Sequence, residues 1–283
     1  MSKSKKYVYF CGMKGLIQYT INVKGDLLDL SQPHVMGILN VTPDSFFSGS
    51  RKQTEKEISE RADQILSEGA SIIDVGAYST RPGGAFVSEE EEISRMRHGL
   101  EIVRRSHPNA IVSVDTFRSS VASMSVNEFG ADIINDVSEG EADSSLFGTV
   151  AQLNVPYILM STKPTLHDMV ISFSQKVQQL RDLGVKDIIL DPGFGFGKTI
   201  EQNFSILADM EKLRELELPI LVGVSRKSMI FKTLECTPNE SLNGTSVINT
   251  ISLMKGASIL RVHDVKEAME VIKIVKKMEN SCS

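Results

Sequence analysis

Two cations stand at the end of one strongly apolar stretch of this chain, and they are the most unusual chemistry in the sequence. Residues 220–224 (ILVGV) have the composition of a short strand buried on both faces, and they lead directly into Ser225, Arg226 and Lys227. Burying a cation is costly unless a partner offsets its charge. The stretch therefore predicts that an anionic or electron-rich ligand binds at the carboxyl end of this strand.

The same arrangement, an apolar strand followed by polar residues, recurs along the chain. Strands are predicted to begin near residues 35, 72, 111, 133, 157, 188, 220 and 259, each followed by a helical stretch. Eight short strand–helix units favour a single-domain (β/α)8 TIM barrel, and a doubly wound open sheet is the alternative. In a barrel these polar residues share one pocket: Asn40, Asp74, Asp115, Asn135, Asp191, Lys227, Arg261 and His263.

The N-terminal segment precedes this alternation. We expect residues 1–14 to form a disordered extension and residues 15–283 to form the barrel domain. A hairpin-like pattern around Lys24-Gly25-Asp26, within residues 7–32, predicts a short plug under the barrel.

Helix starts and long loops can also be located. Thr54 followed by Glu57, and Ser88 followed by Glu91, match the capping box that begins many helices. The connections over residues 40–53 and 76–87 are long and rich in Gly, Ser, Thr and Pro. In a barrel both would follow strands on the catalytic face, where long loops often act as lids.

Composition excludes several classes of protein. The 283 residues are 41% hydrophobic and 24% charged, which suits one large globular domain. A net charge of −5 argues against a nucleic-acid surface, and no apolar run approaches the length of a membrane span. Cys11, Cys236 and Cys282 are too far apart for a zinc motif and odd in number, which favours a reducing cytoplasm.

The types of the polar residues indicate a ligand class. Carboxylates and amides can bind the edge of a nitrogen-rich heterocycle, as they do with nucleic-acid bases. Lys227, Arg261 and His263 suit phosphate oxygens, beside which Mg²⁺ needs one or two protein oxygens. The residues alone therefore predict a pocket for a polar heterocycle next to a diphosphate or triphosphate.

Familiar motifs do not explain the glycine-rich stretch at residues 191–199 (DPGFGFGKT). It ends like a Walker A loop, but Pro192 stands where the first glycine should be. It is not a dinucleotide fingerprint either, because Lys198 replaces the last glycine. We also find no GxSxG, HExxH or Cys/His zinc pattern.

Taken together, several segments closely resemble the dihydropteroate synthase family. They are MGILNVTPDSF at 36–46, DVG at 74–76, STRPG at 79–83, SVDT at 113–116, INDV at 134–137, LDPGFGFGK at 190–198, GVSRKS at 223–228 and RVHDV at 261–265. The resemblance runs from about residue 15 to the end, in the family's order.

This resemblance implies a (β/α)8 barrel and a cytoplasmic homodimer. It implies a transferase of an alkyl or aryl group other than methyl, acting in folate biosynthesis. The enzyme would join p-aminobenzoate to 6-hydroxymethyl-7,8-dihydropterin diphosphate with Mg²⁺, releasing pyrophosphate and 7,8-dihydropteroate. Sulfonamides, which mimic p-aminobenzoate, would compete for the same site.

The resemblance also implies residue roles. The pterin would be bound by Asp115, Asn135, Asp191 and Lys227. The diphosphate would be bound by Asn40, Arg261 and His263, with Asn40 next to the metal. The p-aminobenzoate would be bound by Phe46, Thr80, Arg81, Pro82, Phe196 and Ser225, and the catalytic set would be Asp115, Lys227, Arg261 and His263.

Two segments depart from the family's pattern. Residues 76–79 read GAYS instead of the usual GGES, and Ser161-Thr162 follows Met160 where the family usually has His-Met. Two alternatives use the same pocket: a methyltetrahydrofolate-dependent methyltransferase and a catalytically silent pterin-binding relative. The methyltransferase needs no diphosphate clamp, whereas Arg261 and His263 are present here. A silent relative should have lost residues such as Arg81 or Lys227, and both remain.

Overall fold

The computed structural model describes residues 19–41, 51–78 and 86–281, with the side chains of 51–54 left aside. A parallel sheet in the order β8-β7-β6-β5-β4-β3-β10-β9 dominates it. Its strands are β3 (His34–Asn40), β4 (Ile72–Gly76), β5 (Ile111–Asp115), β6 (Ile133–Asp136), β7 (Tyr157–Met160), β8 (Ile188–Asp191), β9 (Leu221–Val222) and β10 (Ile259–Val262). A parallel bridge between Leu190 and Ile220 joins the two outer strands, so the sheet forms a nearly closed barrel.

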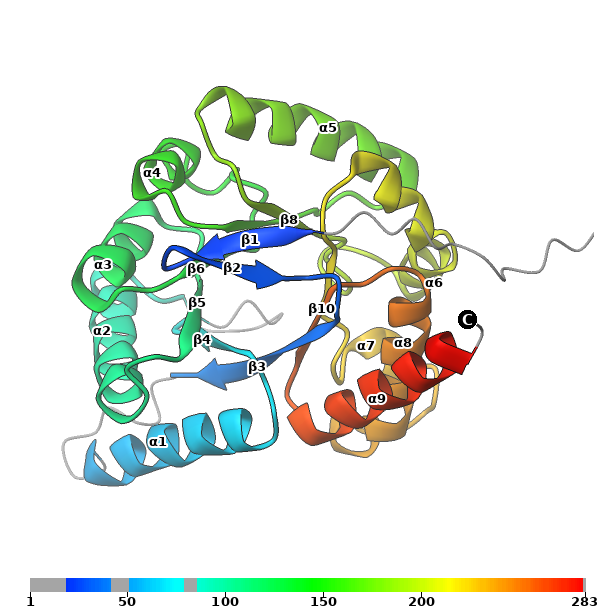
Figure 1. Cartoon of the computed structure of the whole chain (residues 1–283), viewed down its shortest axis with the longest axis horizontal. Coiled ribbons are helices and arrows are strands. Elements are labelled where there is room, and N and C mark those ends of the chain that lie inside the picture. The colour runs from blue at the N-terminus through cyan, green and yellow to red at the C-terminus, as the bar shows by residue number, and fades with distance from the viewer. Residues whose placement is uncertain (1–18, 42–50, 79–85, 282–283) are drawn as a thin grey trace, which may run out of the picture.

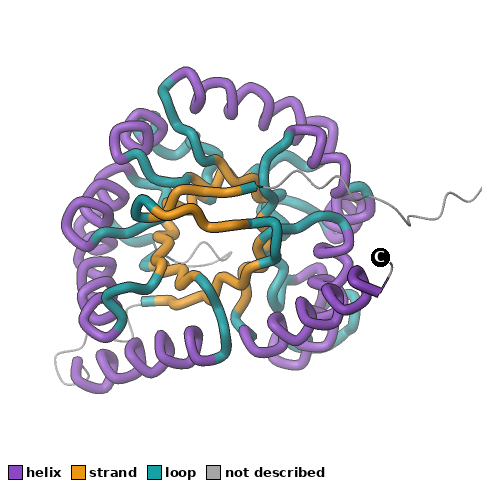
Figure 2. The backbone as a smooth tube through the Cα atoms, viewed as in Figure 1, coloured by secondary structure: helices purple, strands orange, loops and turns teal. Residues whose placement is uncertain are grey.

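Helices surround this barrel on all sides, as Figure 2 shows. They are α1 (Arg51–Ser67), α2 (Glu89–Ser106), α3 (Ser119–Phe129), α4 (Leu146–Leu153), α5 (Leu166–Asp182), α6 (Ile200–Ala208), η2 (Met210–Leu216), α7 (Ser228–Phe231), η3 (Pro238–Glu240), α8 (Leu242–Met254) and α9 (Val265–Ser281). The predicted (β/α)8 barrel is confirmed, every strand beginning within one residue of its predicted start, and the open-sheet alternative is wrong. In the described part of the chain, no helix has the length and apolar character that crossing a bilayer requires.

The barrel strands bury both faces, in two separate cores. Side chains that point outward, such as Val75, Val114 and Leu159, pack against the helices in the larger core. Side chains that point inward, such as Met36 and Ile72, form a smaller core inside the barrel. Burying one such aliphatic side chain contributes about 1.5–3 kcal/mol, so two-sided burial explains why these strands read as continuous apolar runs.

A short antiparallel hairpin closes one end of the barrel. It consists of β1 (Thr20–Val23) and β2 (Asp26–Asp29), and Figure 1 shows it lying across the barrel opening. Lys24 and Gly25 both have positive φ, at 56° and 90°, as the tight turn of a two-residue hairpin loop requires. Ile21 and Val23 pack into the inner core, which confirms the predicted plug.

Of the two predicted helix starts, the one at Ser88 is confirmed and the one at Thr54 is wrong. Ser88 caps α2 and accepts a hydrogen bond from the Glu91 N–H at 3.3 Å, so the predicted helix start is confirmed. The Glu91 carboxylate accepts from Arg95 at 2.7 Å, and the reciprocal half of the predicted capping box is not observed. The start predicted at Thr54 is wrong, because α1 begins at Arg51. Arg, Lys and Gln are good helix formers, so residues 51–53 extend the helix by almost one turn before the capping pattern. The predicted N-terminal disorder and most of both long loops fall outside the described residues.

Candidate active site

The polar side chains gather at the carboxyl ends of the barrel strands, directly above the inner apolar core. Side chains alternate along a strand, so residues two positions beyond the apolar layer also face inward. Ile72, Ile133 and Ile189 belong to the apolar layer, and the residues two positions after them are Asp74, Asn135 and Asp191. All three polar residues are buried. The predicted convergence at one pocket is therefore the geometry that the barrel produces.

Arg261, on β10, is the centre of this polar layer. Its Nε donates to Asp74 Oδ2 at 2.6 Å, and one terminal nitrogen donates to Asp115 Oδ2 at 2.5 Å. Burial raises the pKa of Asp115 to about 7, and the Arg261 charge opposes this rise. Burial alone would lower the pKa of Arg261, but the charges of Asp74 and Asp115 outweigh it and raise that pKa. One guanidinium thus serves two carboxylates from neighbouring strands.

Asn135 is bound to the same cluster but offers one free atom. Its Nδ2 donates to the Asp74 carboxylate at 3.2 Å, which fixes the amide orientation because a carboxylate can only accept. Its Oδ1 is buried and has no hydrogen-bond partner. Leaving a buried acceptor unpaired costs about 1–3 kcal/mol, so this atom is an attractive partner for an N–H of a bound heterocycle.

Lys227 forms a second cluster with the loop that follows β8. Its Nζ donates to the Phe194 carbonyl and lies 4.4 Å from the centre of the Phe196 ring. Burial lowers the pKa of Lys227 to about 8, and the nearby Asp191 charge opposes the change. Burial likewise raises the pKa of Asp191, with Lys227 acting against it. Asp191 also accepts the Gly193 N–H at 2.8 Å, which shapes this loop.

Ser225 and His263 meet at the ends of β9 and β10. The Ser225 hydroxyl lies 3.0 Å from His263 Nδ1 and accepts the His263 backbone N–H at 3.2 Å. The neighbouring Arg226 does not face a ligand, although the sequence pattern grouped it with Lys227. It has φ of 55° and forms a two-pronged ion pair with Asp264 at 2.8 and 2.9 Å. Of the two cations after residues 220–224, only Lys227 joins the candidate site.

Asn40 stands at the rim, exposed at the end of β3. A Cβ placed on Gly76 would lie 3.6 Å from both Asn40 Oδ1 and the Asp115 Cβ, so these side chains approach each other over Gly76. No three or more His, Cys, Asp or Glu side chains within residues 19–41, 55–78 and 86–281 are arranged to hold a metal ion.

Of the p-aminobenzoate-binding residues that the resemblance implies, only some lie within the described residues. Phe196 is half-buried beside Lys227, and Ser225 is buried against His263. Phe46, Thr80, Arg81 and Pro82 lie outside the described residues.

Asp74 was expected in the pocket but received no role from the resemblance. The structure makes it the partner shared by Arg261 and Asn135. Lys198 received no role either, although its ammonium joins two loops of the site. Strand alternation pointed to Asp74, whereas no sequence signal identified the contacts of Lys198.

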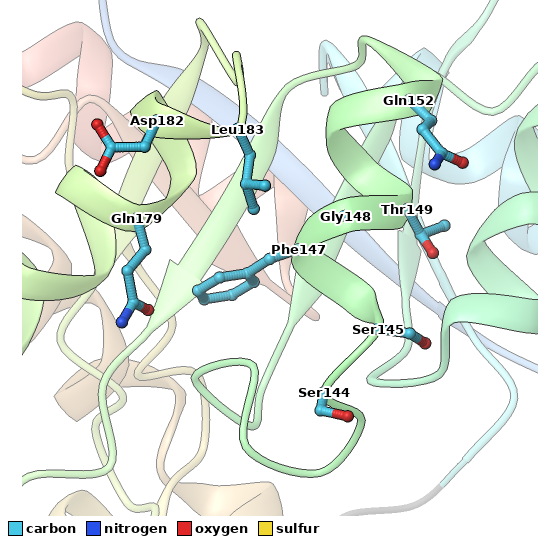
Figure 3. Close-up of a pocket in the computed structure, with 9 residues that line it drawn as sticks. All are labelled: Ser144, Ser145, Phe147, Gly148, Thr149, Gln152, Gln179, Asp182 and Leu183. Atoms are coloured by element: carbon cyan, nitrogen blue, oxygen red, sulfur yellow. The ribbon is translucent and has the colours of Figure 1, made fainter.

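A separate pocket lies in the helical layer, between α4 and α5 (Figure 3). Its lining includes Phe147, Thr149, Gln152 and Leu183 and contains none of the candidate site residues. Its one charged lining residue is Asp182, and no barrel strand ends in it, in contrast to the cluster of charged side chains at the strand ends. The chemistry of this chain is therefore assigned to the barrel.

The fold and the site together define an enzyme of the pterin-binding barrel class. The family model described as pterin binding enzyme matches residues 36–263. Dihydropteroate synthase of Escherichia coli K12 is 39% identical over 268 residues, covering 89% of this chain and 94% of the relative.

Solved structures of dihydropteroate synthases are also similar to this chain. The Yersinia pestis dihydropteroate synthase in complex with a sulfonamide drug has a TM-score of 0.85 at 36% identity, covering 93% of this chain and 100% of that one. The Xanthomonas albilineans synthase with 4-aminobenzoic acid has a TM-score of 0.83 at 31% identity, covering 92% and 98%. The chain belongs to the dihydropteroate synthase family. Its function is accordingly dihydropteroate synthesis in folate biosynthesis.

Proposed function

We propose that the barrel pocket condenses 6-hydroxymethyl-7,8-dihydropterin diphosphate with p-aminobenzoate. The observation that carries this assignment is the buried, unpaired Asn135 Oδ1 beside the Asp74–Arg261–Asp115 cluster. An acceptor next to carboxylates suits the N–H edge of a pterin. The reaction transfers a pterinylmethyl group, so the enzyme is a transferase of an alkyl group other than methyl.

The bond changes are simple. The bond between the pterin methylene carbon and the diphosphate oxygen breaks, and pyrophosphate leaves with the electron pair. The aniline nitrogen attacks the methylene carbon and then loses a proton to water or to the leaving group. No covalent enzyme intermediate is required.

Each cluster of the site has a task in this reaction. Asp115 stabilises positive charge on the pterin-methyl group, while Arg261 and His263 stabilise negative charge on the pyrophosphate. Asn135, Asp191 and Lys227 bind and orient the pterin. Because an aniline is a modest nucleophile, holding it in line with the methylene carbon supplies much of the rate enhancement.

Mg²⁺ fits this site on chemical grounds. The Asn40 amide offers one neutral oxygen at the rim, and Mg²⁺ in proteins is commonly held by one or two side chains plus substrate phosphates. The ion would neutralise charge on the diphosphate. Calorimetric titration of pterin diphosphate, with and without Mg²⁺, tests this: Asn40→Ala should remove most of the Mg²⁺ dependence of binding. Unchanged dependence would contradict the assignment of Asn40.

The direct test of the reaction is pyrophosphate release by the purified protein with Mg²⁺, pterin diphosphate and p-aminobenzoate, each omitted in turn. We expect release only with all three present, and an equal amount of dihydropteroate. Sulfonamides should inhibit competitively against p-aminobenzoate. Pterin binding without turnover would contradict the proposal and indicate a silent relative.

We also propose that the chain forms a homodimer through the outer faces of α8 and α9. Val247 and Met254 on α8 are 50% and 61% exposed, and Ile274 on the adjacent α9 is 69% exposed. Such apolar stripes on a helical surface are typical of protein–protein contacts. Sedimentation analysis should show a dimer that Val247→Asp converts to monomer, whereas Leu27→Asp on the hairpin should leave it intact. A monomeric wild-type protein would refute the proposal.

A cytoplasmic location completes the proposal. It is supported by the odd number of widely spaced cysteines in the sequence, of which Cys236 is the one within the described residues. Cell fractionation would test this location.

A further inference from the structure

Lys198, near the end of the glycine-rich stretch at residues 191–199, joins two loops of the candidate active site. Its Nζ donates to the Ser161 and Gly193 carbonyls, both at 2.9 Å, and to the Phe196 carbonyl at 3.3 Å. A lysine ammonium has three N–H donors, and all three are used here. Lys198 cannot bind a substrate anion without releasing one of these carbonyls, so it is built to hold the backbone.

The loop that Lys198 holds has little rigidity of its own. Gly193, Gly195 and Gly197 all have positive φ, at 64°, 83° and 63°. A Cβ on Gly193 would lie 2.2 Å from the Ser161 carbonyl oxygen, so the loop after β8 packs its bare backbone on the loop after β7. Glycine has the largest conformational freedom to lose, and a loop with three of them needs outside contacts to keep one shape.

The loop after β7 is held from its other side by Glu139. This fully buried residue has φ of 60°, and its carboxylate accepts hydrogen bonds from the hydroxyls of Ser172 and Thr162. Lys163 adds an ion pair at 3.4 Å. Ser161 and Thr162 stand where related chains usually have His-Met. The loop after β7 therefore lies between a buried carboxylate and the Lys198 ammonium.

The loop after β8 also contacts Lys227, one of the proposed pterin-binding residues. The loop after β8 presents the Phe194 carbonyl and the Phe196 ring to Lys227. A Cβ on Gly195 would lie 3.0 Å from the Lys227 side chain, so the loop and that side chain are in close contact. A shift of this loop would therefore displace the groups that Lys227 contacts.

We propose that Lys198 is a positioning residue that clamps the loops after β7 and β8 together and so holds Phe194 and Phe196 against Lys227. The functional consequence rests on the proposed role of Phe196 in binding p-aminobenzoate. Loss of the clamp then weakens binding of the amine substrate most. The pterin loses only the fixed position of Lys227 and keeps its contacts with Asp115, Asn135 and Asp191.

The kinetic test compares the wild-type enzyme with Lys198→Met, which keeps the straight side chain but loses all three donors. We expect the KM for p-aminobenzoate to rise about 10-fold, the scale of a lost charged hydrogen bond. The Kd of pterin diphosphate, measured without p-aminobenzoate, should change by less than about threefold, because three of its four proposed contacts come from strands β5, β6 and β8 and not from the clamped loops. Lys212→Met is the control, since Lys212 is exposed and its ammonium forms an ion pair with Asp209 on the surface, away from both loops.

A second test needs no activity. Hydrogen exchange should be faster in Lys198→Met over residues 161–163 and 192–197 and unchanged elsewhere. Glu139→Gln should accelerate exchange at 161–163, and the double variant should show less than the sum of the two effects, because both act on one loop. Unchanged exchange with unchanged KM would overturn the clamp. So would acceleration across the whole barrel, which would make Lys198 a general stability residue. If the wild type does not use p-aminobenzoate, the functional assignment fails while exchange still decides the clamp.

Discussion

Asp74 offers the sharpest test of the polar layer, because it is buried, touches two candidate site residues and had no role assigned in advance. Asp74→Asn keeps the size of the side chain but removes its charge. The substitution weakens the 2.6 Å bond from Arg261 and turns an N–H toward one of its two donors, Arg261 or Asn135. A hydrogen bond to a charged group contributes about 1.5–3 kcal/mol. That range corresponds to a loss of about 10- to 150-fold in kcat/KM for pterin diphosphate.

The control for this variant is Asp132→Asn at the opposite end of the barrel strands. Asp132 is also a buried carboxylate, with Arg104 at 3.1 Å and the Val112 N–H at 2.8 Å. Both variants should lose about 2 kcal/mol of unfolding free energy, because each leaves an arginine with a weaker partner. Only Asp74→Asn should lose activity. Denaturant titration and pyrophosphate-release kinetics measure the two effects separately, and equal activity in both variants would refute the reasoning.

Four further outcomes are expected. Since burial lowers the pKa of Lys227 to about 8, kcat/KM for pterin diphosphate should fall above that pH, and Lys227→Arg should remove this alkaline limb; a limb that persists in the variant belongs to another group. The same shift from the ordinary 10.5 means that the unfolded chain binds more protons between these values, so this group makes unfolding free energy rise with pH there. Gly37→Ala should lower unfolding free energy by about 1–3 kcal/mol, because the new Cβ would lie 2.4 Å from Ile65; chemical denaturation with no loss would contradict this. Gly148→Ala in α4 meets open space and should raise stability by about 0.5–1 kcal/mol.

The barrel itself was predictable because its strands are buried on both faces. Two-sided burial leaves continuous apolar runs such as residues 188–190, and the polar residue after each run marks where the strand reaches the pocket. The start of α1 was harder to predict. Capping motifs show where a helix is able to begin, but residues 51–53 favour helix as well, so the first turn starts before Thr54.

The membership of the site was also largely predictable, because alternation along each strand decides which residues face inward. The pairing within the site was not. Arg261 is aligned with Met36 on the adjacent strand, yet its guanidinium extends past β3 to Asp74 on β4 and Asp115 on β5. That reach depends on the stagger of the strands, which no local pattern contains. Contacts to backbone carbonyls, such as those of Lys198, leave no residue-type signature at all.

The ion pairs of Arg261 with Asp74 and Asp115 affect which substrate can bind. The charge of Arg261 is offset by Asp74 and Asp115, and Lys227 donates to the Phe194 carbonyl. For Arg261 to hold a diphosphate while Asp115 faces the pterin, their shared bond must be exchanged for two bonds to one substrate. A substrate that carries both the heterocycle and the diphosphate replaces both partners at once. A free pterin or free pyrophosphate replaces only one partner of the Arg261–Asp115 bond, and the other partner loses this bond without a replacement, which favours the intact pterin diphosphate.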